Sequence, residues 1–271
     1  MSRPLWFNEF AKKVFPARFL LAKFTKLPVF DELIYRWFFK GDDLIYLPSN
    51  HVIPINENIG GIEQFILPSK VVDYFIEKAN VHWIMNKCIC RDANQCKVYP
   101  IDFGCLFLGE AALGIHEELG RLVTKEEALQ YAQRCREAGL IHMIGRNHLD
   151  TVWLGVVPGI KLLTICNCCP CCCIWGILSD VANQIGSTVS RMPGLKISIN
   201  DQCVACGICL QDVCFVDAIS VIDGRYTIDD TCRGCGRCIS VCPVGAIEVH
   251  IQDERFIETT ISRILPLVDL S

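Results

Sequence analysis

The sequence predicts an α+β protein, in which a cysteine-rich N-terminal α+β domain precedes a smaller C-terminal domain. Residues 124–139 carry a capping box and end in glycine, which predicts a helix. Residues 152–165 form an apolar segment typical of paired strands, and residues 174–189 have apolar residues at helical spacing. Residues 198–247 repeat a unit of short strand, cysteine loop and short helical turn.

These features divide the chain into three parts. Residues 1–45 form an amphipathic N-terminal arm, and residues 46–193 form the cysteine-rich domain. Residues 194–271 form the C-terminal domain, which ends in a small amphipathic helix over residues 256–267. The linker is expected at residues 192–194, because their proline and glycine break the preceding helix.

Composition and charge exclude several classes of protein. The chain has 271 residues and a net charge of −4, and it lacks a dense basic patch, so we expect no nucleic-acid partner. No uninterrupted apolar run reaches about 18 residues, so no transmembrane helix is predicted. The N-terminus lacks the pattern of a secretory signal, and we therefore expect a cytoplasmic protein.

Cysteine is the most informative residue type in this chain. There are 19 cysteines, and an odd number cannot pair completely within one chain. A reducing cytosol keeps thiols reduced, so dense cysteine there indicates metal binding rather than disulfides. No nucleotide-binding loop and no serine or cysteine catalytic set accompanies them.

The C-terminal repeat contains two cysteine motifs. A C-x2-C-x2-C loop can wrap three thiolates around one face of an iron–sulfur cubane, while the fourth ligand comes from elsewhere. Small residues let each loop curl tightly and direct backbone N–H groups at the sulfurs; they are Ala205, Gly207, Gly234 and Gly236. The motif cysteines are Cys203, Cys206, Cys209 and Cys214, followed by Cys232, Cys235, Cys238 and Cys242.

Over residues 196–251 this pattern resembles the bacterial two-[4Fe–4S] ferredoxins, which implies a ferredoxin-like domain with two [4Fe–4S] clusters. In that family the fourth cysteine of each motif crosses to the other cluster. The first motif departs from the family pattern, with four residues before Cys214 rather than three and Phe215 where proline is usual. The resemblance implies one cluster on Cys203, Cys206, Cys209 and Cys242, and the other on Cys232, Cys235, Cys238 and Cys214.

A second cysteine field lies in the middle of the chain, and we predict that it holds one or two further iron–sulfur centres. Zinc is an alternative, although Cys88-x-Cys90 is tighter than the usual zinc spacing, and a redox-active thiol set is another. Disulfides among neighbouring cysteines are geometrically poor. The field comprises Cys88, Cys90, Cys96, Cys105, Cys166, Cys168, Cys169, Cys171, Cys172 and Cys173.

The string over residues 166–173 lies between the expected strands and the expected helix over 174–189. A helix N-terminus there would favour thiolates and an anionic cluster. Adjacent side chains point in different directions, so some of these cysteines should reach toward residues 88–105. The tandem cysteine pairs resemble those of heterodisulfide-reductase-like subunits with noncubane clusters. The whole N-terminal part resembles uncharacterised iron–sulfur proteins of anaerobic bacteria and archaea.

Three other residues have two interpretations each. Arg91 could donate hydrogen bonds to an anionic cluster or form an ordinary surface ion pair. His82 is expected to be a packed or surface residue rather than a ligand. Cys135 lies in the expected helix over 124–139, away from the other cysteines, and is expected to be an inert packed or exposed thiol.

The N-terminal arm combines basic residues with large apolar ones. Residues 1–40 contain eight Lys or Arg and three Asp or Glu, a net charge of +5, and residues 31–40 predict a short helix. Three interpretations are open. The arm could contact the inner face of an anionic membrane, bind an acidic redox partner, or pack on the chain's own core.

The combined pattern predicts an electron-transfer protein that relays single electrons between redox partner proteins. The partners are expected to belong to a larger oxidoreductase complex in anaerobic metabolism. One alternative is a reductase subunit whose N-terminal centre reacts with a disulfide or thiol. Another is a carrier or scaffold that delivers clusters to other proteins.

Overall fold

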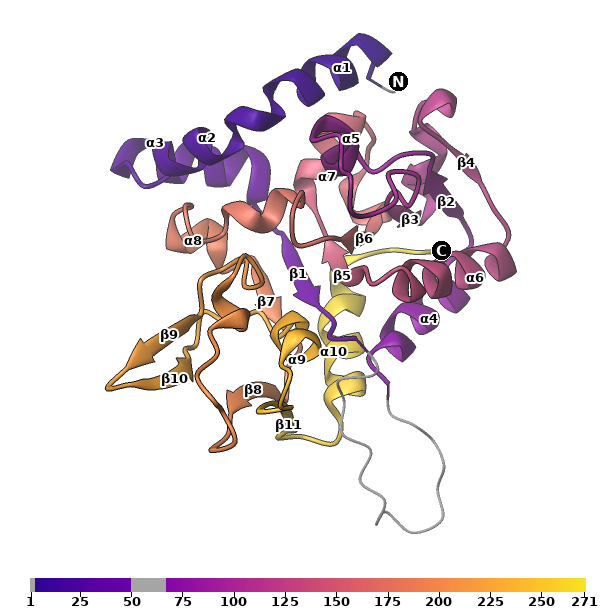
Figure 1. Cartoon of the computed structure of the whole chain (residues 1–271). Coiled ribbons are helices and arrows are strands. Elements are labelled where there is room, and N and C mark those ends of the chain that lie inside the picture. Colours follow the sequence, from indigo (N-terminus) through magenta and orange to yellow (C-terminus); the bar gives the residue numbers. More distant parts are fainter. Residues whose placement is uncertain (1–2, 50–66) are drawn as a thin grey trace, which may run out of the picture.

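The computed structural model describes residues 3–49 and 67–271; residues 1–2 of the arm and 50–66 of the cysteine-rich part lie outside this description. The chain is α+β, as the sequence predicts, with helices on both sides of a mixed sheet (Figure 1). No helix among the described residues is long and apolar enough to cross a membrane.

A seven-stranded sheet forms the centre of the N-terminal part. Its strands follow the order β4-β2-β3-β6-β5-β1-β7, and all neighbours are antiparallel except β1 and β7. The central strands are almost wholly buried, so both faces must be covered. The strands are β1 (Asp43–Tyr46), β2 (His82–Met85), β3 (Leu106–Leu108), β4 (Gly120–Leu122), β5 (Ile141–Arg146), β6 (Leu163–Cys168) and β7 (Val189–Arg191).

Helices α4 (Ser69–Lys78), α6 (Lys125–Glu137) and α10 (Phe256–Ile264) pack together beside this sheet. The predicted capping box at the start of α6 is confirmed, and Gly139 after its end has a left-handed backbone. The predicted C-terminal helix is also confirmed, with a 3-10 turn (Leu265–Leu267) after it. Short turns connect β3 to β4 at Glu110–Gly114 and Glu117–Leu119.

The C-terminal part contains two small antiparallel pairs. Strand β8 (Leu195–Ile199) pairs with β11 (Ile247–Ile251), and β9 (Ile219–Ile222) pairs with β10 (Arg225–Ile228). A 3-10 turn (Ile208–Leu210) and helix α9 (Arg237–Val241) follow the two cysteine loops. Apolar residues of β8 and β11 belong to the same buried cluster as α4 and α10, so the two parts share one core.

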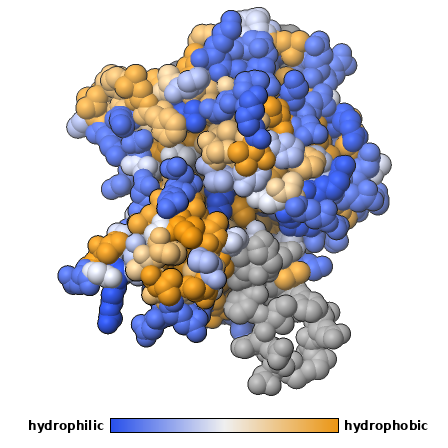
Figure 2. Space-filling view, viewed as in Figure 1, coloured by the Kyte–Doolittle hydropathy of each residue, from blue (hydrophilic) through white to orange (hydrophobic). Residues whose placement is uncertain are grey.

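The arm consists of α1 (Leu5–Val14), a 3-10 turn (Phe15–Ala17), α2 (Arg18–Phe24), α3 (Pro28–Ile34) and a π-helical turn (Tyr35–Phe39). The short helix predicted for residues 31–40 is confirmed, since α3 and the π-helical turn together cover most of this range. Only a few arm residues are buried against the body, among them Asn8, Ala22 and Thr25. Most of the large apolar side chains remain exposed, and they gather over α2 and α3 (Figure 2). Packing on the chain's own core therefore accounts for little of this apolar surface.

Two sequence expectations are wrong. Residues 152–165 are not paired strands: their first part completes α7 (His148–Leu154), a 3-10 turn (Gly159–Lys161) follows, and only β6 is extended. Residues 174–189 are not one helix but a 3-10 turn (Ile174–Ile177), the short α8 (Asn183–Gly186) and the start of β7. In both segments apolar side chains are mixed between buried and partly or fully exposed positions, as at Leu154 and Val157, so their spacing does not mark one face.

Candidate metal centres

The eight C-terminal cysteines line two separate cavities. Each cavity draws three cysteines from one loop and the fourth from the other repeat unit. Each cavity is small, with a volume of about 20 Å³. The first is lined by Cys203, Cys206, Cys209 and Cys242, and the second by Cys214, Cys232, Cys235 and Cys238.

Backbone geometry explains how the loops surround these cavities. Gly207 and Gly236, at equivalent places in the repeat, have φ of 76° and 78°, which glycine adopts without strain. Backbone N–H groups also point at sulfur: Ala218 N lies 3.3 Å from Cys214 Sγ, and Ala246 N lies 3.3 Å from Cys242 Sγ. Such N–H donors stabilise bound thiolates.

The two cavities differ in their access to solvent. Cys206 in the first cavity is exposed, whereas all four cysteines of the second are buried or half-buried. Burial raises the pKa of Cys232 in the second cavity to about 11. The first cavity therefore lies at the protein surface, and the second faces the N-terminal part.

The ten cysteines of the middle field separate into two sets. The four-cysteine set consists of Cys96, Cys169, Cys171 and Cys172, whose sulfurs all lie within 4.8 Å of one another. The individual Sγ–Sγ distances include 3.7 Å from Cys96 to Cys171, 3.8 Å from Cys171 to Cys169 and 3.5 Å from Cys172 to Cys171.

The other six cysteines form a second group without an exposed member, the six-cysteine set: Cys88, Cys90, Cys105, Cys166, Cys168 and Cys173. Cys105 Sγ lies 3.8 Å from Cys166 Sγ, and Cys173 Sγ lies 3.3 Å from Cys168 Sγ. A hydrogen bond from Cys90 lowers the pKa of Cys88 to about 7. Hydrogen bonds from Cys166 and Cys173 hold the pKa of Cys168 well below its ordinary value.

Strand geometry accounts for part of this division. Cys166 and Cys168 alternate with Asn167 along β6, so both face the same side of the sheet. The chain leaves the strand at Cys169 and turns over residues 170–172, which brings its next sulfurs toward Cys96. The expectation that the string divides and reaches toward residues 88–105 agrees with this arrangement.

Arg91 lies at the junction of the two sets, on the short helix α5 (Ile89–Ala93). It is fully buried, so the interpretation as a surface ion pair is wrong. Its guanidinium donates to three carbonyls: Pro100 O at 2.8 Å, Asn167 O at 2.7 Å and Phe103 O. Burial alone would lower the pKa of Arg91, but the thiols around it, Cys88 first, raise it above its ordinary value.

A second buried arginine, Arg237 on α9, lies between the second cavity and the six-cysteine set. Its Nη2 donates to Cys168 O at 3.0 Å, while its Nε and Nη1 are buried without a hydrogen-bond partner among the described residues. The guanidinium lies 5.4 Å from the ring centre of Phe215, which in turn lies 5.0 Å from the ring of Tyr46. The Tyr46 hydroxyl oxygen lies 3.9 Å from Cys173 Sγ, so these three residues connect the second cavity with the six-cysteine set.

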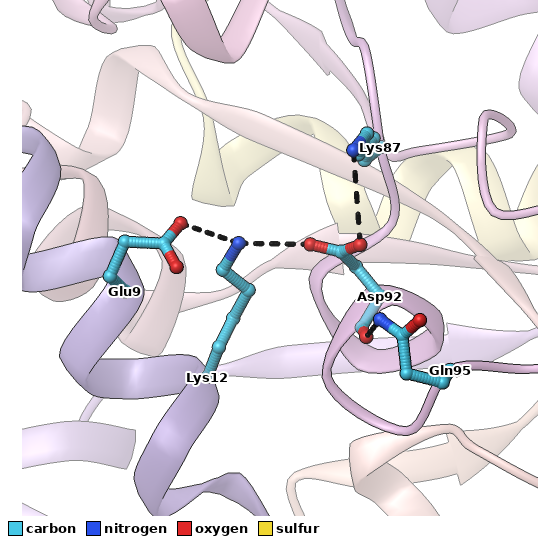
Figure 3. Close-up of polar contacts among 5 residues, drawn as sticks. All are labelled: Glu9, Lys12, Lys87, Asp92 and Gln95. Atoms are coloured by element: carbon cyan, nitrogen blue, oxygen red, sulfur yellow. Dashed lines mark hydrogen bonds and ion pairs between the residues drawn. The ribbon is translucent and has the colours of Figure 1, made fainter.

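An ion pair connects the N-terminal arm to α5, next to the middle cysteine field. Lys12 on α1 bonds Asp92 of α5 at 2.9 Å and also pairs with Glu9, and Lys87 approaches the other oxygen of Asp92 (Figure 3). Burial lowers the pKa of Arg18, and the nearby thiols, Cys90 first, oppose that shift.

Two candidate residues are packed, as expected. His82 is buried, and its Nε2 lies 2.7 Å from Ile76 O rather than near a sulfur. Cys135 is fully buried in α6, and burial raises its pKa to about 12, so this thiol is inert. Sequence reasoning missed Arg237 and Tyr46, and it noted Phe215 only as a departure from the family pattern. The importance of all three depends on contacts between distant segments.

The residues fit anionic iron–sulfur clusters. The donor sets consist of cysteine sulfur alone, backbone N–H groups point at a sulfur in each C-terminal cavity, and Arg237 has two buried nitrogen atoms without a hydrogen-bond partner among the described residues. Neither buried arginine pairs with a carboxylate within the described part of the chain.

Comparison with known proteins supports this assignment at the C-terminus. Residues 211–253 match a family described as the LdpA Fe-S cluster-binding domain. No curated protein and no solved structure matches the chain. The C-terminal part is therefore an iron–sulfur cluster-binding domain, and the chain as a whole is an iron–sulfur protein.

Proposed function

We propose that the chain is a multi-cluster electron-transfer protein that relays single electrons between redox partner proteins, as part of a larger oxidoreductase complex in anaerobic metabolism. In this proposal the two C-terminal cavities each hold a [4Fe–4S] cluster, with the crossed ligand sets described above. The six-cysteine set holds a further iron–sulfur centre. Clusters of this kind accept and donate single electrons at potentials set by hydrogen bonds and burial.

The observation that carries the proposal is the pair of buried arginines without carboxylate partners. A buried cation is costly unless an anion lies beside it. Arg91 and Arg237 are surrounded by thiols instead, and thiols carry the required negative charge when they are ionised by metal binding. Inert neutral thiols would leave both guanidinium groups uncompensated.

The junction residues suggest the order of the centres. Arg237, Phe215 and Tyr46 connect the second C-terminal cavity with the six-cysteine set. The first cavity lies at the surface beyond the second, where exposed Cys206 marks an approach for a partner. We therefore place the three centres in the order first cavity, second cavity, six-cysteine set.

The test is a reductive titration of the full chain, purified without oxygen and followed by EPR. We expect at least three one-electron steps per chain, and a shift of two of them in Arg237→Gln, because this arginine faces two centres. Arg225→Gln, an exposed arginine on β10, is the matched control and should shift none. Two or fewer steps, or rapid turnover of an added disulfide by the reduced chain, would instead favour the reductase alternative or a thiol site.

A further inference from the structure

The sulfur atoms of the four-cysteine set lie closer together than those at the C-terminal cluster sites of the same chain. Its sulfurs are in mutual contact, with Sγ–Sγ distances of 3.5 to 3.8 Å for three pairs and no pair beyond 4.8 Å. The C-terminal cysteines line two separate cavities, and no group of them with sulfurs this close together is found in the described residues.

These distances fit one metal ion. A tetrahedral ion with metal–sulfur bonds of about 2.3 Å places its four thiolates about 3.8 Å apart along each edge. A cubane carries its four cysteines on its outer corners, so their sulfurs must stand farther apart. The observed separations match the single-ion tetrahedron.

Local structure supports a ligand role for these thiols. Pro170 and the turn over residues 170–172 bring Cys169, Cys171 and Cys172 together despite their short spacing. Cys96 comes from another segment, and its sulfur accepts a hydrogen bond from Tyr99 N at 3.4 Å. A backbone N–H directed at sulfur stabilises a metal-bound thiolate.

We propose that Cys96, Cys169, Cys171 and Cys172 form a mononuclear tetrathiolate site for one Zn²⁺ or iron ion, distinct from the iron–sulfur centres of the chain. This inference does not depend on the relay. A zinc ion would fasten the string over 166–173 to the loop after α5, and an iron ion would add a one-electron centre at the surface, where Cys171 is exposed.

The test is metal and acid-labile sulfide analysis of the full chain, with zinc-edge X-ray absorption and EPR. We expect one zinc or one sulfide-free iron per chain, seen as a single shell of sulfur at about 2.3 Å or as a high-spin ferric signal. Cys171→Ser should lose this ion and keep the cluster iron, and Cys135→Ser, a buried thiol outside every set, should keep both. Cys96→Ser provides a second ligand variant if Cys171→Ser is insoluble.

Two results would overturn the mononuclear site. One is equal iron and sulfide with no zinc, together with the loss of about four irons and four sulfides in Cys171→Ser, which would indicate a cubane at this set. The other is an unchanged metal content in both ligand variants. Neither result bears on the C-terminal clusters, so the relay is tested separately.

A second inference comes from the arm, on independent observations. Among the described residues of the arm, 13 large apolar side chains are at least 37% exposed, including Trp6 at 68%, Val29 at 78% and Trp37 at 67%. Soluble proteins rarely leave large apolar patches uncovered. These residues come from α1, α2, α3 and the turns around them, and those over α2 and α3 form a patch in Figure 2.

Charge indicates what covers this patch. Residues 1–40 carry a net charge of +5. Because the whole chain has a net charge of −4, the remaining 231 residues carry a net charge of −9. Lys13, Lys23, Arg36 and Lys40 are exposed and form no ion pair within the described ranges. Basic residues flanking Trp, Phe and Leu on helices too short to cross a bilayer are typical of surface-bound membrane helices.

We infer that the arm docks on an anionic membrane surface, with its apolar side chains in the lipid interface and the acidic body facing away. The probes are vesicles of phosphatidylglycerol mixed with phosphatidylcholine, compared with phosphatidylcholine alone, and the readout is co-flotation of the full chain. Lipids brominated on their acyl chains should quench Trp6 and Trp37.

Neutralising variants make this test specific. Lys13→Gln and Lys23→Gln should each weaken binding to anionic vesicles about fivefold. Lys78→Gln on α4 and Lys196→Gln on β8, exposed lysines outside the arm, are matched controls and should leave it unchanged. Absence of binding, equal binding to neutral vesicles, or burial of the arm in a dimer of this chain would overturn the inference.

Discussion

Replacing Arg91 tests how the cysteine field is held together. Its guanidinium connects three separate segments by donating to Pro100 O, Phe103 O and Asn167 O. Arg91→Met removes all three bonds and the positive charge, whereas Arg91→Lys keeps the charge but cannot reach all three carbonyls at once. We expect the methionine variant to be much less stable and the lysine variant to be intermediate.

The magnitude follows from the contacts. Hydrogen bonds to a charged group contribute about 1.5–3 kcal/mol each, so three give an upper bound of about 9 kcal/mol. Removing one partner of a buried charge pair costs about 3–5 kcal/mol. We expect about 4 kcal/mol for Arg91→Met and about 2 kcal/mol for Arg91→Lys. At about 2–4 °C per kcal/mol, the methionine variant should melt about 8–16 °C lower.

The assay is thermal unfolding without oxygen at one fixed scan rate, combined with iron and sulfide analysis. Arg91→Met should also lose iron from the cysteine field, because the anionic centre loses its counter-charge, while Arg91→Lys should keep it. Arg225→Met, the same change at an exposed position, should stay within about 0.5 kcal/mol of the unmodified chain. A methionine variant with unchanged melting and full iron would refute both the three-bond account and the charge-balance argument.

Three further predictions concern other parts of the chain. Burial raises the pKa of Asp42 to about 8, so its proton stabilises the fold fully below its unfolded pKa of about 3.8, and this contribution is lost as the pH rises toward 8. Between pH 6 and 8 the unmodified chain should lose about 2 kcal/mol more than Asp42→Asn; parallel melting curves for the two would contradict this. Cys214→Ser should disturb the cluster that carries Cys232, and Cys242→Ser should disturb the one that carries Cys203; EPR of each variant would reveal the opposite pairing if the ligands do not cross. Cys135→Ser should keep the full metal content, and a loss of iron would show that this thiol is a ligand after all.

Elements with a local signal could be predicted from the sequence. Helix α6 begins at a capping box whose two reciprocal bonds both form, and the doubled cysteine loops create matching left-handed turns. Each of these features depends on residues within a few positions of one another. Their chemistry therefore identifies them without knowledge of the tertiary structure.

Elements that depend on tertiary contacts could not be predicted. Helix α7 buries the polar Asp150 and Thr151 and leaves the apolar Val152 and Trp153 half-buried, so its apolar residues do not mark its buried face at helical spacing. In hindsight Asn147 and Asp150, which are hydrogen-bonded at 2.7 Å, mark the start of α7, and Gly155 in the left-handed region marks its end. The division of the ten middle cysteines depends on where β6 and the loop after α5 meet, which no spacing in the string encodes.

The most direct test of the central claim is the iron and acid-labile sulfide content of the full chain, purified without oxygen. If the C-terminal domain and the six-cysteine set both hold iron–sulfur centres, each chain should contain clearly more than about eight irons, with sulfide to match. About eight irons and eight sulfides, with the middle field holding only zinc or free thiols, would contradict the account.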